Sequence, residues 1–229
     1  MMGMYYNFYV IGLGGTGSLI ARDLPKLLIG RDDESKIVLI DGDIVEKKNM
    51  DRQSYQAQDV GDYKSDMLAK KINSFYGTNC FSKNTYLQND ELIRYTKEDP
   101  DNIIIIGCVD NDATRKILEK SVNSLIKNED MNIFYIDSAN GEYDGNIYSF
   151  YHFNGKDYGV MRSSIYDLED DIHPMDASCE EQAKNGNVQY LVTNAKMSVG
   201  ILELCNAILE NRPAGGIINV KRFTQIYYD

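Results

Sequence analysis

Continuous apolar runs alternate with segments of helical periodicity through the first 137 residues. The runs predict buried strands because they are short and rich in β-branched or aromatic residues; they cover residues 5–11, 36–43, 102–109 and 132–137. Apolar residues recur at helical spacing in the segments 18–29, 64–75 and 111–126. Residues 78–86 predict a less regular strand, and Pro25 should kink or shorten the first helix. The alternation predicts an α/β fold with a doubly wound, mostly parallel sheet.

The pattern changes after residue 140, where a turn replaces the expected helix. Gly141 and Gly145 flank this turn, and residues 146–153 form the next strand-like run. A strand reached without a helix predicts antiparallel strands added to the C-terminal part of the sheet. The remaining residues predict three segments. Residues 154–187, rich in charge and glycine, form a loop over the sheet, called the excursion below. Residues 189–209 form a long apolar helix, and residues 217–228 a closing strand or hairpin.

A glycine-rich sequence joins the first predicted strand to the first helix. Gly12, Gly14 and Gly17 follow the order G-x-G-x-x-G: the first permits a tight turn, the second lets backbone approach a phosphate, and the third lets the helix pack on the strand. The helix N-terminus then faces the anion. This order is typical of Rossmann-like nucleotide-binding domains, although a purely structural turn fits the same glycines.

Carboxylates end the second predicted strand. Asp41 and Asp43 follow its apolar residues, and Asp41 lies about 24 residues beyond Gly17, near the spacing at which an acid meets ribose hydroxyls in dinucleotide-binding folds. Open α/β sheets bind ligands at the carboxyl ends of their strands. We therefore expect both acids at a nucleotide site.

Further polar residues follow the second and fourth predicted strands. Arg52 can hold phosphate oxygens by paired hydrogen bonds, with Asn49 donating beside it. Lys64 can add a positive charge at the head of the next helix. Asp110 can carry Mg²⁺, which prefers one or two carboxylates together with substrate oxygens. The structural alternatives are a surface ion pair for Arg52, a solvated side chain for Lys64 and a helix cap for Asp110.

Composition narrows the class of protein. The net charge of −11 argues against sequence-independent binding to nucleic acid or to an anionic membrane surface. The first strand follows the initial methionines directly and no apolar run is long enough to span a bilayer, so we expect a cytoplasmic protein. The four cysteines form no C-x-x-C pair, so neither a zinc site nor a disulfide framework is expected.

In their order along the chain, these motifs resemble the ubiquitin-activating-enzyme superfamily of ThiF, MoeB and HesA type. The matching series is Gly12-x-Gly14-Gly15-x-Gly17, Asp41-x-Asp43, Asn49-x-x-Arg52-Gln53, Gly61-x-x-Lys64 and Asp110-Asn111-x-x-x-Arg115. The chain looks most like short ThiF-like proteins of bacterial plasmids and mobile elements. The resemblance implies one ThiF-like adenylation domain over residues 1–229, with its nucleotide-binding core at 5–137 and a crossover loop, long helix and closing strands at 138–229.

The same resemblance implies an activity, a cofactor set and partners. The activity is ATP-dependent adenylylation of a carboxylate, usually that of the C-terminal glycine of a ubiquitin-like or sulfur-carrier protein, with release of pyrophosphate. The implied cofactors are ATP and Mg²⁺, and a homodimer is expected. Carried over by position, Gly14 and its neighbours Gly12, Gly15 and Gly17 cradle phosphates, and Asp41 holds the ribose hydroxyls. The triphosphate is bound by Asn49, Arg52 and Lys64, and Mg²⁺ by Asp110. Two further residues, Asp43 and Gln53, are expected at the same nucleotide site.

One cysteine of this chain matches a reactive position of many relatives, whereas an arginine of many relatives has no counterpart here. Cys179 lies in the excursion, where relatives carry a cysteine that accepts the activated acyl group. Glu180 and Glu181 beside it would raise a thiol's pKa, so a structural role competes with the nucleophile role. Many relatives bring an arginine on an N-terminal helix; here another chain supplies that charge, or it is dispensed with, or the protein is impaired. Cys108 and Cys205 are expected in the core.

Two other functions compete with adenylylation. A nucleotide-binding partner subunit without turnover would explain the missing N-terminal arginine. An NAD-dependent oxidoreductase would account for the glycine loop and Asp41, but leaves Arg52, Lys64 and Asp110 without a purpose. Binding of ATP in preference to NAD, and pyrophosphate exchange, separate the three functions.

Overall fold

The computed structural model describes residues 5–31, 35–97, 102–127, 131–176 and 191–221. Its sheet contains β1 (Asn7–Ile11), β2 (Lys36–Ile40), β3 (Asn79–Lys83), β4 (Asn102–Gly107), β5 (Asn132–Asn140), β6 (Gly145–Phe153), β7 (Lys156–Gly159) and β8 (Gly216–Val220). The helices are α1 (Gly15–Leu28), α2 (Lys64–Tyr76), α3 (Glu91–Thr96), α4 (Asp112–Leu125) and α6 (Leu191–Leu209). Single 3₁₀ turns lie at Lys47–Asn49, Ala57–Asp59 and Arg162–Ser164.

The sheet confirms the predicted doubly wound arrangement. Its order is β3-β2-β1-β4-β5-β6-β7, with β8 also paired to β6. Strands β1 to β5 are parallel, whereas β6 runs antiparallel to β5, and β7 and β8 each pair antiparallel with β6. Because the chain leaves β1 toward β2 and later returns to β4 on the other side, a ligand crevice is expected between the ends of β1 and β4.

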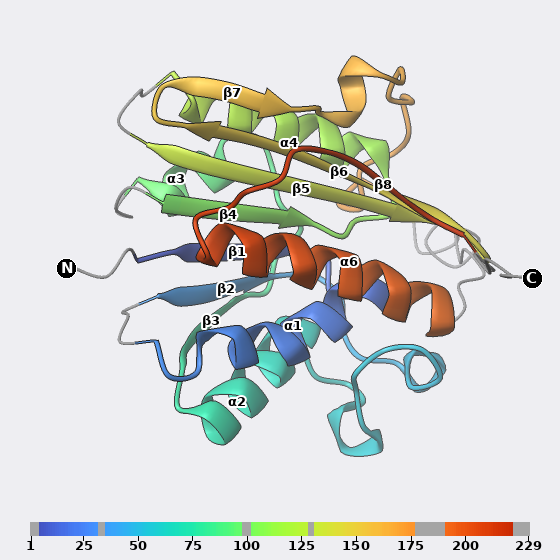
Figure 1. Cartoon of the computed structure of the whole chain (residues 1–229). Helices are drawn as coiled ribbons and strands as arrows, with labels where there is room; N and C mark the ends of the chain where they lie inside the picture. Colours follow the sequence, from blue (N-terminus) through green and yellow to red (C-terminus); the bar gives the residue numbers. More distant parts are fainter. Residues whose placement is uncertain (1–4, 32–34, 98–101, 128–130, 177–190, 222–229) are drawn as a thin grey trace, which may run out of the picture.

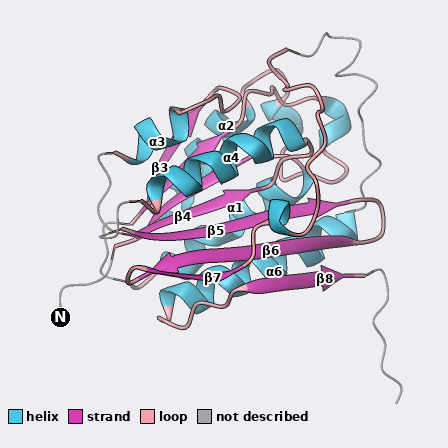
Figure 2. Cartoon of the chain, turned by 90° about the horizontal axis from the view of Figure 1, so that it is seen from above, coloured by secondary structure: helices cyan, strands magenta, loops and turns pink. Residues whose placement is uncertain are grey.

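Helices cover both faces of the sheet (Figures 1 and 2). Helices α1, α2 and α6 pack against one hydrophobic cluster, and α3 and α4 against the other. Alternate residues of β4 supply both clusters: Ile104 and Ile106 face α1, while Ile103 and Ile105 face α4. Burial on both faces explains why this strand is a continuous apolar run rather than an alternating one.

Three predicted elements differ from the observed ones. Helix α1 continues through Pro25 to Leu28, because Pro25 is itself buried with Leu24 and Leu28 and this packing outweighs the hydrogen bond that proline cannot make. Strand β3 ends at Lys83 rather than at residue 86. The predicted excursion begins with β7, which forms a hairpin with β6, so its first residues belong to the sheet. Residues 177–190 and 222–229 of the predicted excursion and closing strand lie outside the described residues.

Candidate functional site

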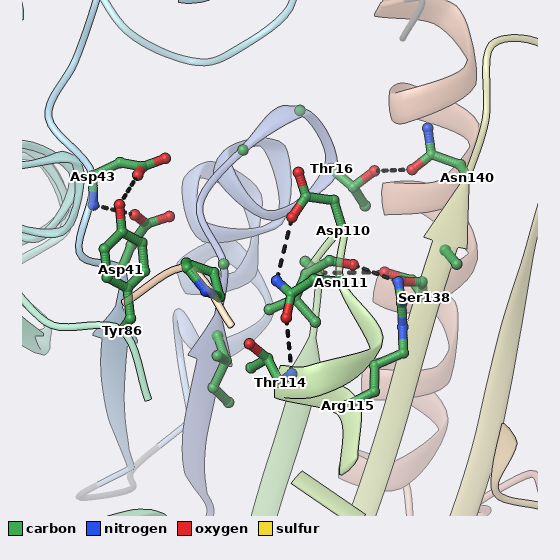
Figure 3. Close-up of a pocket in the computed structure, with 18 of the residues that line it drawn as sticks. Thr16, Asp41, Asp43, Tyr86, Asp110, Asn111, Thr114, Arg115, Ser138 and Asn140 are labelled. Atoms are coloured by element: carbon green, nitrogen blue, oxygen red, sulfur yellow. Dashed lines mark hydrogen bonds between the residues drawn. The ribbon is translucent and has the colours of Figure 1, made fainter. Parts of the chain in front are cut away.

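A pocket of about 790 Å³ lies at the carboxyl ends of β1, β2 and β4. Figure 3 shows Asp110 and Asn111 between the Asp41 and Asp43 side of the pocket and the Thr16 and Asn140 side. The lining includes residues from every predicted site motif: Gly12, Gly14, Gly15, Asp41, Asp43, Asn49, Arg52, Gln53, Lys64 and Asp110. The fold therefore brings together motifs that are spread over about a hundred residues of sequence.

The glycine loop presents unblocked backbone to this pocket. Gly12 has φ +83°, and a Cβ on it would lie 2.7 Å from the Cys108 carbonyl oxygen. A Cβ on Gly14 would meet nothing within 4 Å. Helix α1 begins after Gly14 without a side-chain cap and carries no acidic residue in its first turn. Its free N–H groups and positive dipole end suit an anion such as a phosphate.

The glycine loop gives a paired prediction. A Cβ on Gly17 would lie 1.8 Å from the Gly12 carbonyl oxygen, so Gly17→Ala should cost about 3 kcal/mol or more of unfolding free energy. Gly14→Ala has room and should fold normally, but its methyl group would occupy the phosphate approach and weaken ATP binding about tenfold or more. Urea unfolding and nucleotide titration of both variants check this. Unchanged ATP affinity in Gly14→Ala would contradict the placement of phosphate on the loop.

Asp41 is held by backbone at the end of β2. Its carboxylate accepts hydrogen bonds from the amides of Leu13, at 2.5 Å, and Asp43, at 2.7 Å. Burial raises the pKa of Asp41 to about 6, although the nearby Lys64 acts to lower it. The carboxylate thus ties the glycine loop to the second strand while it lines the pocket.

An ion pair between Asp43 and Lys64 lies beside Asp41. Lys64 Nζ lies 2.6 Å from Asp43 Oδ2, and the Tyr86 hydroxyl donates to the other carboxylate oxygen. Burial acts to raise the pKa of Asp43, but the Lys64 ammonium outweighs it and the pKa is lowered. Lys64 is 5% exposed, so the alternative of a solvated helix residue is wrong. Its side chain is instead directed toward the two carboxylates.

The raised pKa of Asp41 gives a pH prediction. A folded-state pKa near 6, above the usual value near 4, means that folding favours the protonated form. Relative to Asp41→Asn, the wild type should therefore lose about 2 to 3 kcal/mol of unfolding free energy as the pH rises from 4 to 7. Urea unfolding of both proteins across this range measures the difference. A difference independent of pH would contradict the burial of an ionisable carboxyl here.

The polar segment after β2 is ordered by Asn49. This residue is buried, and its Oδ1 accepts from the Glu46 amide at 2.8 Å, closing the 3₁₀ turn. Arg52 Nη1 donates to the Lys48 carbonyl at 3.1 Å and to Asp51 at 3.0 Å, and its side chain is 22% exposed. Within the described residues, Gln53 Oε1 is buried without a hydrogen-bond partner. The turn thus fixes the backbone from which Arg52 reaches the pocket.

Asp110 lies at the pocket edge where β4 leads into α4. The Asn111 side chain caps α4 by accepting from the Thr114 amide at 2.8 Å, and its Nδ2 lies 3.4 Å from Asp110 Oδ1 (Figure 3). Because Asn111 is the cap, the exposed Asp110 carboxylate is left available to a ligand. Across the described ranges, no group of three or more histidine, cysteine, aspartate or glutamate side chains is arranged to hold a metal. A single carboxylate suits Mg²⁺ only where substrate oxygens complete its coordination.

A buried charge network beneath the pocket was not predicted from the sequence. Asp137 is fully buried at the end of β5 and is ion-paired with both Arg115 and Arg162. Arg115 also donates to the carbonyl oxygens of Val109 and Ser138, which joins the ends of β4 and β5. Arg115 appears in the family motif and Asp137 ends a predicted strand, but no pattern in the sequence pairs either of them with Arg162.

A second missed feature is the attachment of residues 165–176 to helix α4. The Asp171 carboxylate accepts from the amides of Asp112, at 2.7 Å, and Ala113, at 2.6 Å. Asp112 in turn accepts from the Glu169 amide at 2.9 Å. The Nε2 atom of His173 lies 2.9 Å from the Leu87 carbonyl oxygen. These contacts hold the segment beside the pocket, where Asp171 contributes to the lining.

The cysteines divide between core and pocket. Cys179, the predicted acyl acceptor, lies outside the described residues. Cys205 is fully buried as expected, whereas Cys108 is half-buried and lines the pocket. Burial raises the pKa of the Cys108 thiol to about 12, which leaves it unreactive near neutral pH.

His152 and the apolar character of the helices lie outside the pocket's polar contacts. His152 is buried in β6, and its Nδ1 lies 2.6 Å from Asp157 Oδ1. No helix within the described part of the chain has the length and apolar character needed to cross a bilayer.

Comparison with known proteins assigns this chain to a family. The ThiF family matches residues 6–209. A curated relative, ubiquitin-like modifier-activating enzyme 5 of Oryza sativa subsp. japonica, is 26% identical over 131 residues, covering 52% of this chain and 30% of the relative. Among solved structures, PaaA is 15% identical with a TM-score of 0.62, covering 96% of this chain and 65% of PaaA. Escherichia coli MccB with ATP is 15% identical with a TM-score of 0.63, covering 90% and 56%. This chain therefore spans less than two thirds of each of these proteins, and it belongs to the ThiF family.

Proposed function

We propose that this protein is an adenylyltransferase that activates the C-terminal carboxylate of a ubiquitin-like or sulfur-carrier protein, or of a peptide, at the expense of ATP. The observation that carries the proposal is the convergence in one pocket of the glycine loop, the Asp41–Asp43 strand end, Arg52, Lys64 and Asp110. A dinucleotide oxidoreductase would have no use for the last three groups. Tighter binding of ATP than of NAD in a direct titration is the expected result, and the reverse preference would contradict the proposal.

In this proposal the nucleotide lies across the carboxyl ends of β1, β2 and β4. Asp41 accepts the ribose hydroxyls, and the loop from Gly12 to Gly17 with the α1 N-terminus receives phosphate. The triphosphate is bound by Asn49, Arg52, Gln53 and Lys64. The pocket fits a nucleotide because Gly14 faces open space and the first turn of α1 has neither cap nor acid. Lys64 exchanges part of its contact with Asp43 for a phosphate oxygen.

The chemistry requires positioning and charge neutralisation rather than a general base. An oxygen of the already ionised acceptor carboxylate attacks the α-phosphorus, a new P–O bond forms, and the bond to the β-phosphate oxygen breaks. Pyrophosphate leaves with the bonding electrons, and the acyl adenylate remains. Arg52 and Lys64 are placed to offset the charge that gathers on the leaving group. Asp110 would hold Mg²⁺, which supplies neutralisation of the phosphate oxygens when bound.

The proposed class of acceptor, a protein or peptide carboxylate, is supported by the ThiF family match and by the names of two similar proteins. The rice relative is named as a ubiquitin-like modifier-activating enzyme, and one of the similar structures is of E. coli MccB with both AMPCPP and MccA. The latter is 16% identical with a TM-score of 0.63, which shows a shared fold. We carry over to this chain a protein or peptide acceptor, a homodimer as the working assembly, and Cys179 as an acyl acceptor to be tested.

Two ion pairs in the pocket also support a second candidate function, a partner subunit that binds nucleotide without catalysis. Lys64 is paired with Asp43 and Arg52 contacts Asp51, so both cations are engaged. A subunit that binds nucleotide without turnover would keep these pairs. Binding of ATP without pyrophosphate exchange for any acceptor would support this second function over the first.

A further inference from the structure

Asn146 lies on β6, at the end of the pocket away from Asp41 and Asp43. Thr16 and Asn140 belong to the same end, and Figure 3 shows them across the pocket from the two carboxylates. Asn146 is half-buried and stands opposite Ala139 in the β5–β6 pairing. This end of the pocket is therefore built from β5, β6 and the start of α1. The proposed function assigns phosphate to the start of α1, so this end lies beside the phosphates, and it gives Asn146 no role.

The orientation of the Asn146 amide is fixed by Arg162. Arg162 Nη1 donates to Asn146 Oδ1 at 2.8 Å, and a guanidinium has donors only, so the amide must present its oxygen to it. Arg162 is itself held from two further sides: its Nε is paired with buried Asp137, and its guanidinium carbon lies 4.4 Å from the Tyr148 ring centroid. The amide group of Asn146 therefore cannot flip without loss of this hydrogen bond.

The fixed orientation turns the Asn146 NH₂ group away from Arg162. In the described part of the chain, this Nδ2 donates to no acceptor, and it is not among the polar atoms sealed from solvent. The neighbouring amide at this end is already used, because Asn140 accepts from Thr16 and donates to Asn194. Asn146 is thus an oriented, accessible double donor on the pocket wall.

We propose that Asn146 binds the carboxylate of the acceptor at this end of the pocket, and that Arg162 acts as the positioning residue that orients its amide. This inference rests on the proposed function, because it assigns the second substrate of the same reaction. The N–H group that points away from Oδ1 donates to a carboxylate oxygen in a charge-assisted hydrogen bond, which is about twice as strong as the bond it could make to the neutral oxygen of a C-terminal carboxamide. The site therefore selects an unmodified C-terminus.

An isosteric variant separates binding from folding. Asn146→Asp keeps the size and the oxygen that Arg162 contacts, but replaces the NH₂ donor by a second, negatively charged oxygen. The matched control is Asn219→Asp on β8, because Asn219 is exposed and stands opposite Asn146 in the β6–β8 pairing. It adds the same charge one strand away. Any effect of net charge or of strand pairing appears in both variants.

The experiment measures binding and needs no turnover. The probe is an acetylated tripeptide ending in Gly-Gly, with a free carboxylate or a C-terminal amide, titrated by NMR into the protein saturated with a non-hydrolysable ATP analogue and Mg²⁺. We expect the carboxylate to bind at least about tenfold more tightly than the amide in the wild type and in Asn219→Asp. Asn146→Asp should lose this preference while its affinity for the nucleotide is unchanged.

The outcomes separate the two proposals. Equal binding of carboxylate and amide by the wild type, an unchanged preference in Asn146→Asp, or no binding of either probe would overturn the role of Asn146. If the preference depends on Asn146 but no acceptor supports pyrophosphate exchange, the carboxylate site stands and adenylylation fails.

Discussion

Replacing Asp110 by alanine should reduce acceptor-dependent turnover about 100-fold or more while the protein stays folded. The side chain is exposed, and its only hydrogen bond among the described residues is the long contact from Asn111, so little stability is lost. Turnover is lost because the carboxylate proposed to hold Mg²⁺ against the phosphates is gone. Pyrophosphate release at saturating ATP, beside a thermal unfolding curve, measures both effects.

Asp90→Ala provides the matched control for this result. Asp90 is also an exposed acid at the start of a helix, α3, where its side chain forms no cap hydrogen bond, and it lies outside the pocket lining. It should leave turnover unchanged. Equal losses in the two variants would mean that general charge, rather than a carboxylate at the pocket, supports the reaction.

Asp137→Ala should cost about 3 to 5 kcal/mol of unfolding free energy. The side chain is fully buried and pairs with Arg115 and Arg162, so its removal leaves two buried guanidinium groups without their shared carboxylate. The ends of β4 and β5 should loosen with it, because Arg115 joins them through the Val109 and Ser138 carbonyls. Urea unfolding monitored by circular dichroism measures the loss.

A surface ion pair serves as the comparison. Asp170 is fully exposed and pairs with Lys116, so Asp170→Ala should leave the urea midpoint essentially unchanged. A small loss for Asp137→Ala, similar to that for Asp170→Ala, would show that water reaches the Asp137 network and that it does not secure the strand ends.

Much of the fold was predictable because its signals are local. The continuous run at β4 reflects burial on both faces, and the helical spacing over residues 111–126 correctly predicted α4 at Asp112–Leu125. The turn flanked by Gly141 and Gly145 correctly predicted an antiparallel β6. In each case the responsible residues lie within a few positions of the feature that they determine.

Features that depend on distant residues were not predictable. The sequence gives no reason to pair Lys64 with Asp43, because the contact arises only where α2 packs beside the end of β2. Arg162 lies in a polar stretch with no periodicity, and its role follows only from the hairpin that brings it to Asp137 and Asn146. Helix α1 continues through Pro25 because tertiary packing overrides local propensity.

The most direct test of the central claim is ATP–pyrophosphate exchange by the purified protein with Mg²⁺. It is measured with and without carrier proteins ending in Gly-Gly, and repeated with Arg52→Ala and Asp110→Ala. The account predicts exchange that requires a carrier and disappears in both variants. Failure to bind ATP, or exchange that persists undiminished in both variants, would contradict adenylylation at this pocket. Binding of ATP without exchange for any carrier would leave the non-catalytic partner as the function of the chain.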